Sequence, residues 1–321
     1  MKSRRIVFMG TPEFAVATLG SLLMNGFNVV GAVTVPDKPA GRGRTIHKSA
    51  VKIFAESSYI PVLQPANLKD PEFIKQLKAL KPDVFIVVAF RMLPEEVWRI
   101  PASGTINLHA SLLPDYRGAA PINHAIINGE TRTGVTTFLI DSKIDTGKIL
   151  LREELNIYPF ENAGDLHDRM TRLGARLVIK TLAGIFDKSI TPRPQSDFIK
   201  PDTVLKTAPK IHTEDCIINW DSEALKIHNL IRGLAPSPGA RTFLKNKNTS
   251  LTLKIFESLP ETEKHKYKPG DIVTDGKVYM KIACIDGFIN ITGLQLEGKK
   301  KMNTIEFLRG FKVADYKTDI S

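Results

Sequence analysis

Short apolar runs alternate with amphipathic stretches through the first two hundred residues. The longest run, residues 84–90, is continuous, as expected for a strand that is covered on both faces. Such runs predict strands over residues 5–10, 28–35, 84–90, 104–108, 135–140 and 149–155. Apolar positions at helical spacing predict helices over residues 13–25, 51–57, 71–80, 121–128 and 163–185. We therefore expect a doubly wound, mostly parallel, Rossmann-like α/β sheet, whose ligands bind at the carboxyl ends of the strands.

The pattern changes after residue 188. Residues 188–209 are rich in Pro, Thr, Ser and charge, which is typical of a linker. Beyond them we predict one helix over residues 222–232. Short strands are predicted over residues 241–243, 251–256, 270–273, 277–283 and 288–296. Short strands with glycine turns indicate a small, OB-like β-barrel. We expect an α/β domain over residues 1–189, a linker over 190–208 and a barrel domain over 209–321.

Composition adds a basic character and few ligands for metals. The chain carries 45 Lys and Arg against 34 Asp and Glu, a formal net charge of +11, which suits a polyanionic partner or simply solubility. Its two cysteines, Cys216 and Cys284, are far apart, and no His, Cys, Asp or Glu cluster has metal-ligand spacing, so we expect no disulfide and no metal. No apolar run is long enough for a membrane span or a signal peptide, so we expect a cytoplasmic protein. We also expect it to be a monomer.

Candidate chemistry gathers at one strand end. Asn107 and His109 are two residues apart, so on a strand they point to the same face. Asp145 follows in the predicted loop Asp145-Thr146-Gly147. An amide can stabilise an oxyanion, an imidazole can move a proton, and a carboxylate can orient the imidazole, a set that suits acyl or formyl transfer. The competing interpretation is that His109 is only a hydrogen-bonded histidine at a strand end.

The run over residues 107–122, Asn-Leu-His-Ala-Ser-Leu-Leu-Pro-Asp-Tyr-Arg-Gly-Ala-Ala-Pro-Ile, resembles the signature of 10-formyltetrahydrofolate-dependent formyltransferases. Residues 134–147 are similar to the second block of that family. The resemblance implies that Asn107, His109 and Asp145 are the catalytic set, with 10-formyltetrahydrofolate as the formyl donor. It also implies a folate site lined by Phe90, Arg91, Met92, Leu93, Ser111, Leu112, Leu113, Pro114, Ile140 and Asp141.

Two further segments narrow the resemblance. Residues 36–44 form a glycine-rich basic loop, and Lys299-Lys300-Lys301-Met302 lies in the basic C-terminal region. Both are similar to features of the family members that formylate methionyl initiator tRNA for translation initiation, in which the small barrel binds the tRNA. The resemblance implies tRNA contacts at Lys38, Arg42, Arg44, Lys48, Lys299 and Lys300. Such side chains can bind phosphates, although scattered surface lysines are also commonly only solvated.

Three alternatives remain open. One is a formyltransferase that acts on a small amine, such as an amino sugar nucleotide or glycinamide ribonucleotide; the basic loop and the barrel argue against it. A second is a hydrolase of formyltetrahydrofolate, in which water replaces the amine. The third is an RNA-binding protein without catalysis, which would have no need of the Asn-His-Asp set. Phe90-Arg91 stands where the family commonly has Tyr-Gly, which leaves the role of Arg91 open.

Overall fold

The computed structural model describes residues 3–40 and 45–318. The chain folds into two compact units, each with its own sheet and its own buried core. The first unit comprises Met1–Gly118, Thr133–Leu155 and His167–Thr207. The second unit comprises Ala119–Arg132, Asn156–Leu166 and Ala208–Ser321.

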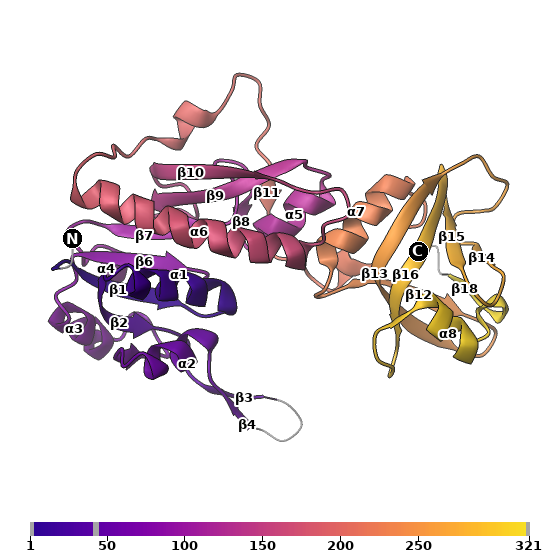
Figure 1. Ribbon diagram of the computed structural model, residues 1–321, viewed down its shortest axis with the longest axis horizontal. Coiled ribbons are helices and arrows are strands. Elements are labelled where there is room, and N and C mark those ends of the chain that lie inside the picture. Colours follow the sequence, from indigo (N-terminus) through magenta and orange to yellow (C-terminus); the bar gives the residue numbers. More distant parts are fainter. Residues whose placement is uncertain (1–2, 41–44, 319–321) are drawn as a thin grey trace. The chain divides into compact units, whose positions relative to one another are not determined.

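The first unit is built on a seven-stranded sheet (Figure 1). Its strands are β1 (Arg5–Gly10), β2 (Asn28–Val33), β5 (Val62–Leu63), β6 (Val84–Val88), β7 (Thr105–His109), β9 (Arg132–Leu139) and β10 (Ile149–Asn156). They lie in the order β10-β9-β7-β6-β1-β2-β5. The pairs from β7 through β6, β1 and β2 to β5 are parallel, whereas β7 pairs with β9 antiparallel. The predicted mostly parallel, Rossmann-like sheet is confirmed.

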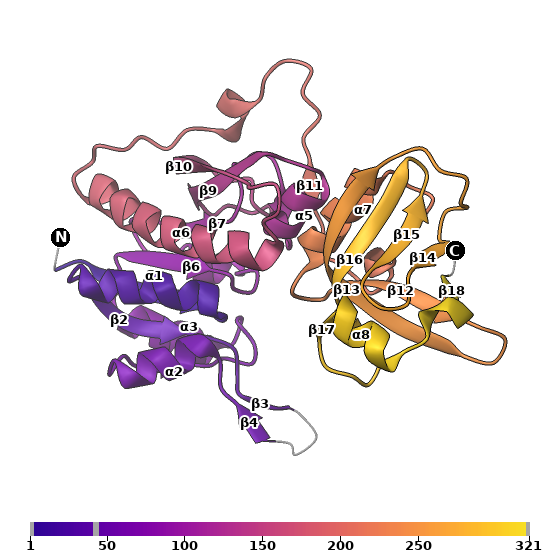
Figure 2. The ribbon, with the colours of Figure 1, turned by 45° about the vertical axis from the view of Figure 1, so that its right-hand side comes forward.

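Helices cover both faces of this sheet. They are α1 (Glu13–Met24), α2 (Ala50–Ser57), α3 (Pro71–Ala79), α4 (Glu95–Trp98) and α6 (Ala163–Phe186). Val7 and Met9 of β1 pack in one cluster with Phe73 and Leu77 of α3. Figures 1 and 2 show α1 and α6 together along a face of the sheet. Helix α6 lies so close to β7 that a Cβ added to its Gly174 would come within 2.7 Å of the Leu108 side chain.

Some local features differ from the prediction. Pro12 occupies the N-cap position of α1, and no side chain caps the helix. The basic loop contains a short hairpin of β3 (Lys38–Ala40) and β4 (Thr45–His47), which pair antiparallel. Both β3 and the short helix α4 escaped prediction because three or four residues carry too little periodicity to be read.

The second unit holds an antiparallel, barrel-like sheet. Its strands are β12 (Ala240–Lys245), β13 (Ser250–Thr262), β14 (Ile272–Thr274), β15 (Met280–Cys284), β16 (Gly287–Leu296), β17 (Met302–Asn303) and β18 (Lys317–Thr318). The order is β14-β15-β16-β13-β12-β18, with β17 on β16. The Thr318 hydroxyl donates to the Gly270 carbonyl at 2.6 Å, which brings β18 beside the start of β14 and nearly closes the barrel. The predicted small barrel is thus confirmed.

Three helices complete this unit, α5 (Pro121–Ile127), α7 (Ala224–Leu234) and α8 (Thr304–Gly310). Trp220 is fully buried in the core, and its indole N–H donates to the Thr242 hydroxyl at 2.9 Å. Helix α5 packs closely on α7, because the Asn123 amide donates to the Gly233 carbonyl at 2.7 Å and a Cβ on Gly233 would lie 2.6 Å from Ile127. Helix α5, although early in the sequence, therefore belongs to the core of the second unit.

Neither cysteine suits a reactive or metal-binding role. Cys216 and Cys284 are both free and buried, and burial raises the pKa of the Cys284 thiol to about 11. Across residues 3–40 and 45–318, no group of three or more His, Cys, Asp or Glu side chains is arranged to hold a metal ion. None of the helices in these same ranges is both long and apolar enough to cross a bilayer.

Candidate active site

Strand β7 places Asn107 and His109 on one face of the first unit's sheet. Asn107 lies opposite Val87 of β6 and Phe138 of β9, and His109 ends the strand opposite Thr136. The alternation predicted from the sequence is therefore present, with both side chains on the same face. His109 is only 6% exposed, whereas Asn107 is partly accessible. A small reactant can reach the amide more readily than the ring.

The His109 imidazole has an oxygen near each ring nitrogen. Nε2–H donates to the Tyr116 carbonyl at 2.8 Å, which fixes the tautomer of the neutral ring. Nδ1 lies 3.8 Å from Oδ2 of Asp145, an ion-pair distance for a protonated ring but too long for a direct hydrogen bond. The same Oδ2 accepts a hydrogen bond from the Gly118 backbone N–H at 3.0 Å. The carboxylate is therefore oriented before any substrate arrives.

The loop that carries Asp145 requires its glycine. Asp145 has a positive φ of 55°, and a Cβ on Gly147 would lie 1.6 Å from the Leu139 carbonyl oxygen. The Thr146 hydroxyl donates to Oδ1 of Asp141 at 2.7 Å, which closes the loop on itself. Each residue of the Asp-Thr-Gly segment thus has a distinct task, and together they bring the carboxylate to His109.

The turn after β7 is held by hydroxyl groups. The Ser111 hydroxyl donates to the Asp115 carbonyl at 2.6 Å, and the Ser111 carbonyl accepts from the Thr136 hydroxyl at 2.6 Å. The Leu113 N–H in turn donates to Thr136 Oγ1 at 3.1 Å, and the Leu113–Pro114 peptide bond is cis. Ser111 and Leu113 have no exposed surface. A ligand at this turn would therefore meet backbone atoms and the partly buried Leu112 rather than these side chains.

Arg91, whose role the sequence leaves open, is bound to the segment that follows β5. Its guanidinium donates to the carbonyls of Pro65 at 2.8 Å and Ala66 at 3.1 Å. It also lies 5.4 Å from the centre of the Phe90 ring. Burial lowers the pKa of Arg91, which nonetheless stays a cation at neutral pH. The side chain thus ties the loop after β6 to the segment that follows β5.

The other residues that the resemblance assigns to folate differ in accessibility. Met92 is 74% exposed, and Asp141 is exposed as well. Ile140 and Leu112 are partly buried, whereas Leu93 belongs to the core next to α3. The exposed and partly buried members can meet a ligand with their side chains; Leu93 can do so only through its backbone.

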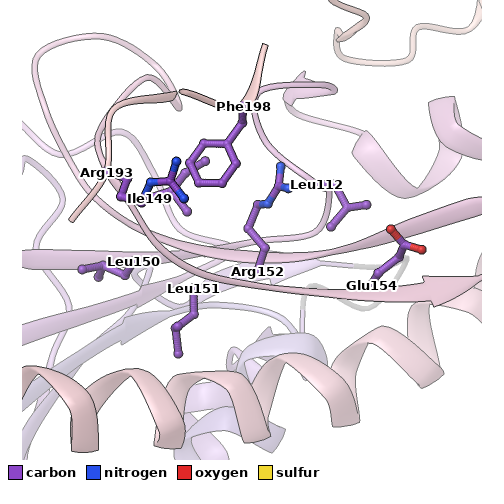
Figure 3. Close-up of a pocket in the computed structure, with 8 residues that line it drawn as sticks. All are labelled: Leu112, Ile149, Leu150, Leu151, Arg152, Glu154, Arg193 and Phe198. Carbon is purple, nitrogen blue, oxygen red and sulfur yellow. The ribbon is translucent and has the colours of Figure 1, made fainter. Parts of the chain in front are cut away.

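The linker lies along the first unit. Arg193 and Ile149 exchange two backbone hydrogen bonds, of 2.8 and 2.9 Å. The Phe198 ring sits between the guanidinium groups of Arg152 and Arg193, at 4.3 and 4.6 Å from its centre (Figure 3). Arg152 also donates to the Leu113 carbonyl at 2.8 Å, which connects this packing to the turn after β7. The part of the linker around residues 193–198 is therefore fixed by specific contacts rather than extended in solvent.

The basic hairpin of the first unit is described only in part. Lys38 is exposed, and Lys48 pairs with Glu56 at 2.7 Å, a hydrogen bond that raises the pKa of Lys48. Arg42 and Arg44 lie outside the described residues, so their predicted role is untouched by the structure. Lys48 would have to exchange its carboxylate partner for a phosphate in order to contact nucleic acid.

The base of this hairpin is anchored by a polar group that the sequence did not indicate. Asp37 accepts from Lys52 at 2.5 Å and from the Gln64 amide at 2.8 Å. Both hydrogen bonds lower the pKa of the Asp37 carboxyl group, and the bond from Lys52 has the larger effect. Gln64 also donates to the Val35 carbonyl at 2.8 Å. Three side chains from separate segments thereby fix where the hairpin leaves the sheet.

The two lysines of the second unit to which the resemblance assigns tRNA contacts lie between β16 and β17. Lys299 and Lys300 are both exposed there, and the Lys299 carbonyl accepts from the Gln295 amide at 2.8 Å. Lys301, next in the chain, pairs with Glu257 at 2.6 Å. The described turn thus presents two lysine side chains outward on a short, anchored connection.

The α/β unit carries Asn107 and His109 on one strand with Asp145 near the imidazole, and the chain continues into a barrel-like unit. Family models of group-transfer enzymes match both parts of the chain. Residues 4–182 match the family model described as formyl transferase, and residues 210–312 match formyl transferase, C-terminal domain. The chain belongs to the formyl transferase family.

Relatives cover almost the entire chain. A methionyl-tRNA formyltransferase of Flavobacterium johnsoniae is 52% identical over 98% of both chains, and one of Bacteroides thetaiotaomicron is 49% identical over 97% of both. Among solved structures, WlaRD, a sugar 3N-formyl transferase crystallised in the presence of dTDP and 5-N-formyl-THF, has a TM-score of 0.63 at 22% identity. That alignment covers 92% of this chain and 99% of WlaRD. This structural likeness supports the fold assignment.

Proposed function

We propose that this protein transfers the formyl group of 10-formyltetrahydrofolate to the α-amino group of methionyl initiator tRNA, as a cytoplasmic, monomeric enzyme. Full-length relatives at about half identity carry the name of that activity. The folate donor is supported by WlaRD, which was crystallised with a formyl folate. The observation that carries the chemistry is the approach of Asp145 to His109, with 3.8 Å between the carboxylate and the imidazole, on the strand whose same face carries Asn107.

The proposed reaction begins with the amine. Its nitrogen adds to the formyl carbon, and the carbonyl electrons move to the oxygen. The Asn107 amide donates to that oxyanion, an interaction whose loss typically costs about 3 to 4 kcal/mol of barrier. Collapse of the tetrahedral intermediate breaks the bond between the formyl carbon and N10 of the folate, and N10 takes up a proton as it leaves.

The proton from the attacking amine passes to the site of His109 and Asp145. Nε2–H is already given to the Tyr116 carbonyl, so Nδ1 is the nitrogen that can accept. The imidazolium so formed would face the Tyr116 carbonyl at one nitrogen and the Asp145 carboxylate at the other. A water held by Asp145 is an alternative carrier of this proton.

The pterin is proposed to lie between the loop after β6 and the loop over residues 140–144, held mostly by backbone groups. The burial of Ser111, Leu113 and Leu93 supports this mode, because these side chains are committed to the protein interior. The tRNA is proposed to contact the basic hairpin and the lysine turn of the barrel. We also propose that residues 1–189 carry the catalytic residues and that residues 209–321 carry the tRNA-binding part, although residues 119–132 and 156–166 pack in the second unit.

A formylation assay tests the proposal. The protein is mixed with 10-formyltetrahydrofolate and methionine-charged initiator tRNA. The amino acid released from the tRNA is then identified by mass spectrometry. We expect formylmethionine at a catalytic rate. In His109→Ala, kcat should fall by about 10²- to 10⁴-fold while the KM for tRNA changes little, because a proton-transfer group is lost. His212→Ala, an exposed histidine of the second unit, serves as the matched control.

Other outcomes of the same assay redirect the proposal. Folate consumed without formylmethionine would indicate the hydrolase. Formylation of amino sugar nucleotides in place of methionyl-tRNA would indicate a small-molecule transferase. Equal turnover by His109→Ala and the wild type would refute the mechanism.

A further inference from the structure

The linker places a buried amide beside Asp145. Gln195 begins the short 3-10 turn η1 (Gln195–Phe198) and is only 4% exposed. Its Nε2 donates to the Asp145 carbonyl at 2.8 Å and to the Gly147 carbonyl at 2.9 Å. Its Oε1 accepts from Nε of Arg117 at 3.1 Å and from Nη2 at 2.6 Å. Both amide hydrogens and the carbonyl oxygen of the side chain are therefore used.

These four bonds join the two segments that flank His109. One segment carries Asp145, and the other carries Arg117 and Gly118. The Gly118 N–H is the donor that orients the Asp145 carboxylate, so Gln195 closes a ring of contacts around that carboxylate. Without the amide, the carbonyl oxygens of Asp145 and Gly147 and the Arg117 guanidinium would each lose their hydrogen bonds to Gln195, and nothing would link the two segments at this point.

A second linker residue fixes the other side of His109. The Tyr116 N–H donates to the Lys206 carbonyl at 2.7 Å, and the Lys206 N–H donates to Oδ1 of Asp115 at 3.0 Å. Tyr116 has a positive φ of 59°, and its carbonyl is the acceptor for Nε2 of His109. Both oxygen partners of the imidazole are thus held in place from the linker.

The linker is itself packed against the sheet. The backbone pairing of Arg193 with Ile149 and the seating of Phe198 between two guanidinium groups hold the residues on either side of Gln195 (Figure 3). A side chain held at both flanks loses little freedom on making its bonds, which makes it suited to hold other groups.

We propose that Gln195 is a positioning residue for Asp145, so that the linker is part of the active site and not only a connection between units. The inference rests on the proposed function of Asp145 beside His109. Gln195 does not touch the reacting atoms; it acts through the backbone of the Asp145 loop. Positioning errors of about 1 Å from groups outside the chemistry can cost about 10²-fold in rate.

Two substitutions test the donor and acceptor groups of the Gln195 side chain. Gln195→Met keeps the length of the side chain and removes all four bonds. Gln195→Glu keeps an acceptor for Arg117 but cannot donate to the carbonyls of Asp145 and Gly147. We expect both variants to lower kcat by about 10- to 100-fold, with both KM values kept within about threefold. Gln76→Met, on the exposed side of α3, is the matched control and should behave as the wild type.

A double-substitution cycle distinguishes positioning from general stability. In an Asp145→Asn background, Gln195→Met should lower kcat by no more than about twofold, because its effect passes through the same carboxylate. Hydrogen exchange supplies a readout that needs no activity: peptides over residues 141–148 should exchange faster in Gln195→Met, whereas peptides from α3 should not. Should Gln195→Met fail to fold in a thermal melt, Gln195→Glu carries both measurements.

Each outcome decides the inference. Lower kcat, loss of the effect in the Asp145→Asn background and faster exchange over 141–148 support it. Wild-type kcat, or an equal loss of rate in both backgrounds, overturns it. If the wild type itself does not formylate methionyl-tRNA, the proposed function fails, and the exchange measurement alone then decides whether Gln195 holds the Asp145 loop.

Discussion

Gly147 shows how strongly single residues shape the catalytic loop. A Cβ there would lie 1.6 Å from the Leu139 carbonyl oxygen, so any side chain must push the loop away from β9. Because Asp145 is two residues earlier, we expect Gly147→Ala to move the carboxylate and to lower the rate constant of formyl transfer by about 10²-fold. The measurement is single-turnover formylation of methionyl-tRNA with saturating folate.

Gly310 gives the control at the same scale. It ends α8, and an added Cβ would meet nothing within 4 Å. Gly310→Ala should therefore leave turnover unchanged and, if anything, stabilise the helix end. A Gly147→Ala enzyme as fast as Gly310→Ala would show that the loop tolerates the displacement and that Asp145 need not be held closely.

Residue patterns predicted part of the site and not the rest. The Asn-x-His spacing on a strand suffices to put Asn107 and His109 on one face, because alternation is a property of the extended backbone. The approach of Asp145 to His109 depends on the conformation of the loop between β9 and β10, which spacing alone does not predict; it was inferred from the family resemblance. Gln195 was missed because a glutamine in a Pro-rich linker reads as solvated until tertiary contacts bury it.

At the scale of elements, α8 begins with a reciprocal cap. The Asn303 side chain accepts from the Glu306 N–H at 2.9 Å, and the Glu306 carboxylate accepts from the Asn303 N–H at 3.2 Å. We expect Asn303→Ala to lower the free energy of unfolding of the second unit by about 1 kcal/mol. For a unit of this size that shifts Tm by about 4 °C, measurable by calorimetry.

Asn248→Ala, in the exposed turn between β12 and β13, is the matched control. It should leave Tm unchanged, since the loss is specific to the cap. An equal Tm for Asn303→Ala and the wild type would mean that the packing of Phe307 and Leu308 in the core holds the helix without its cap.

Element prediction succeeded where the pattern was long and failed where it was short or broken. The continuous run of β6 is too short for a buried helix, so its length favours a strand buried on both faces. The strand β13 was predicted to end at Phe256 but continues to Thr262, although Pro260 lies inside it. Irregular pairing between Ile255 and Ser258 explains the difference, because a bulge breaks the alternation on which the prediction depends. Helix α8 went unpredicted although its Asn-x-x-Glu cap is visible in the sequence.

At the scale of the whole molecule, the net charge of +11 has a measurable consequence if tRNA is the substrate. Each lysine that contacts a phosphate adds about one to the slope of log affinity against log salt. We therefore expect Lys299→Glu with Lys300→Glu to weaken tRNA binding and to reduce that slope by about two. The measurement is a filter-binding titration across several salt concentrations.

A control with the same change in net charge is required, because replacement of any two lysines by glutamates alters the long-range electrostatic field of the protein. Lys75→Glu with Lys78→Glu on α3 meets that need. If both double variants weaken binding equally and with the same slope, the lysines of the barrel turn act through net charge alone and not by contact.

The interleaving of the two units has a consequence for how the protein is made. Helix α5 and residues 156–166 leave the ribosome before the first unit is complete, yet they belong to the second unit. Their partner α7 begins about a hundred residues after α5, which corresponds to about 5 to 20 seconds of synthesis. During that interval the apolar face of α5 has no native partner. The nascent chain therefore exposes this face until α7 has been made, and the two units cannot be expressed separately by a single cut.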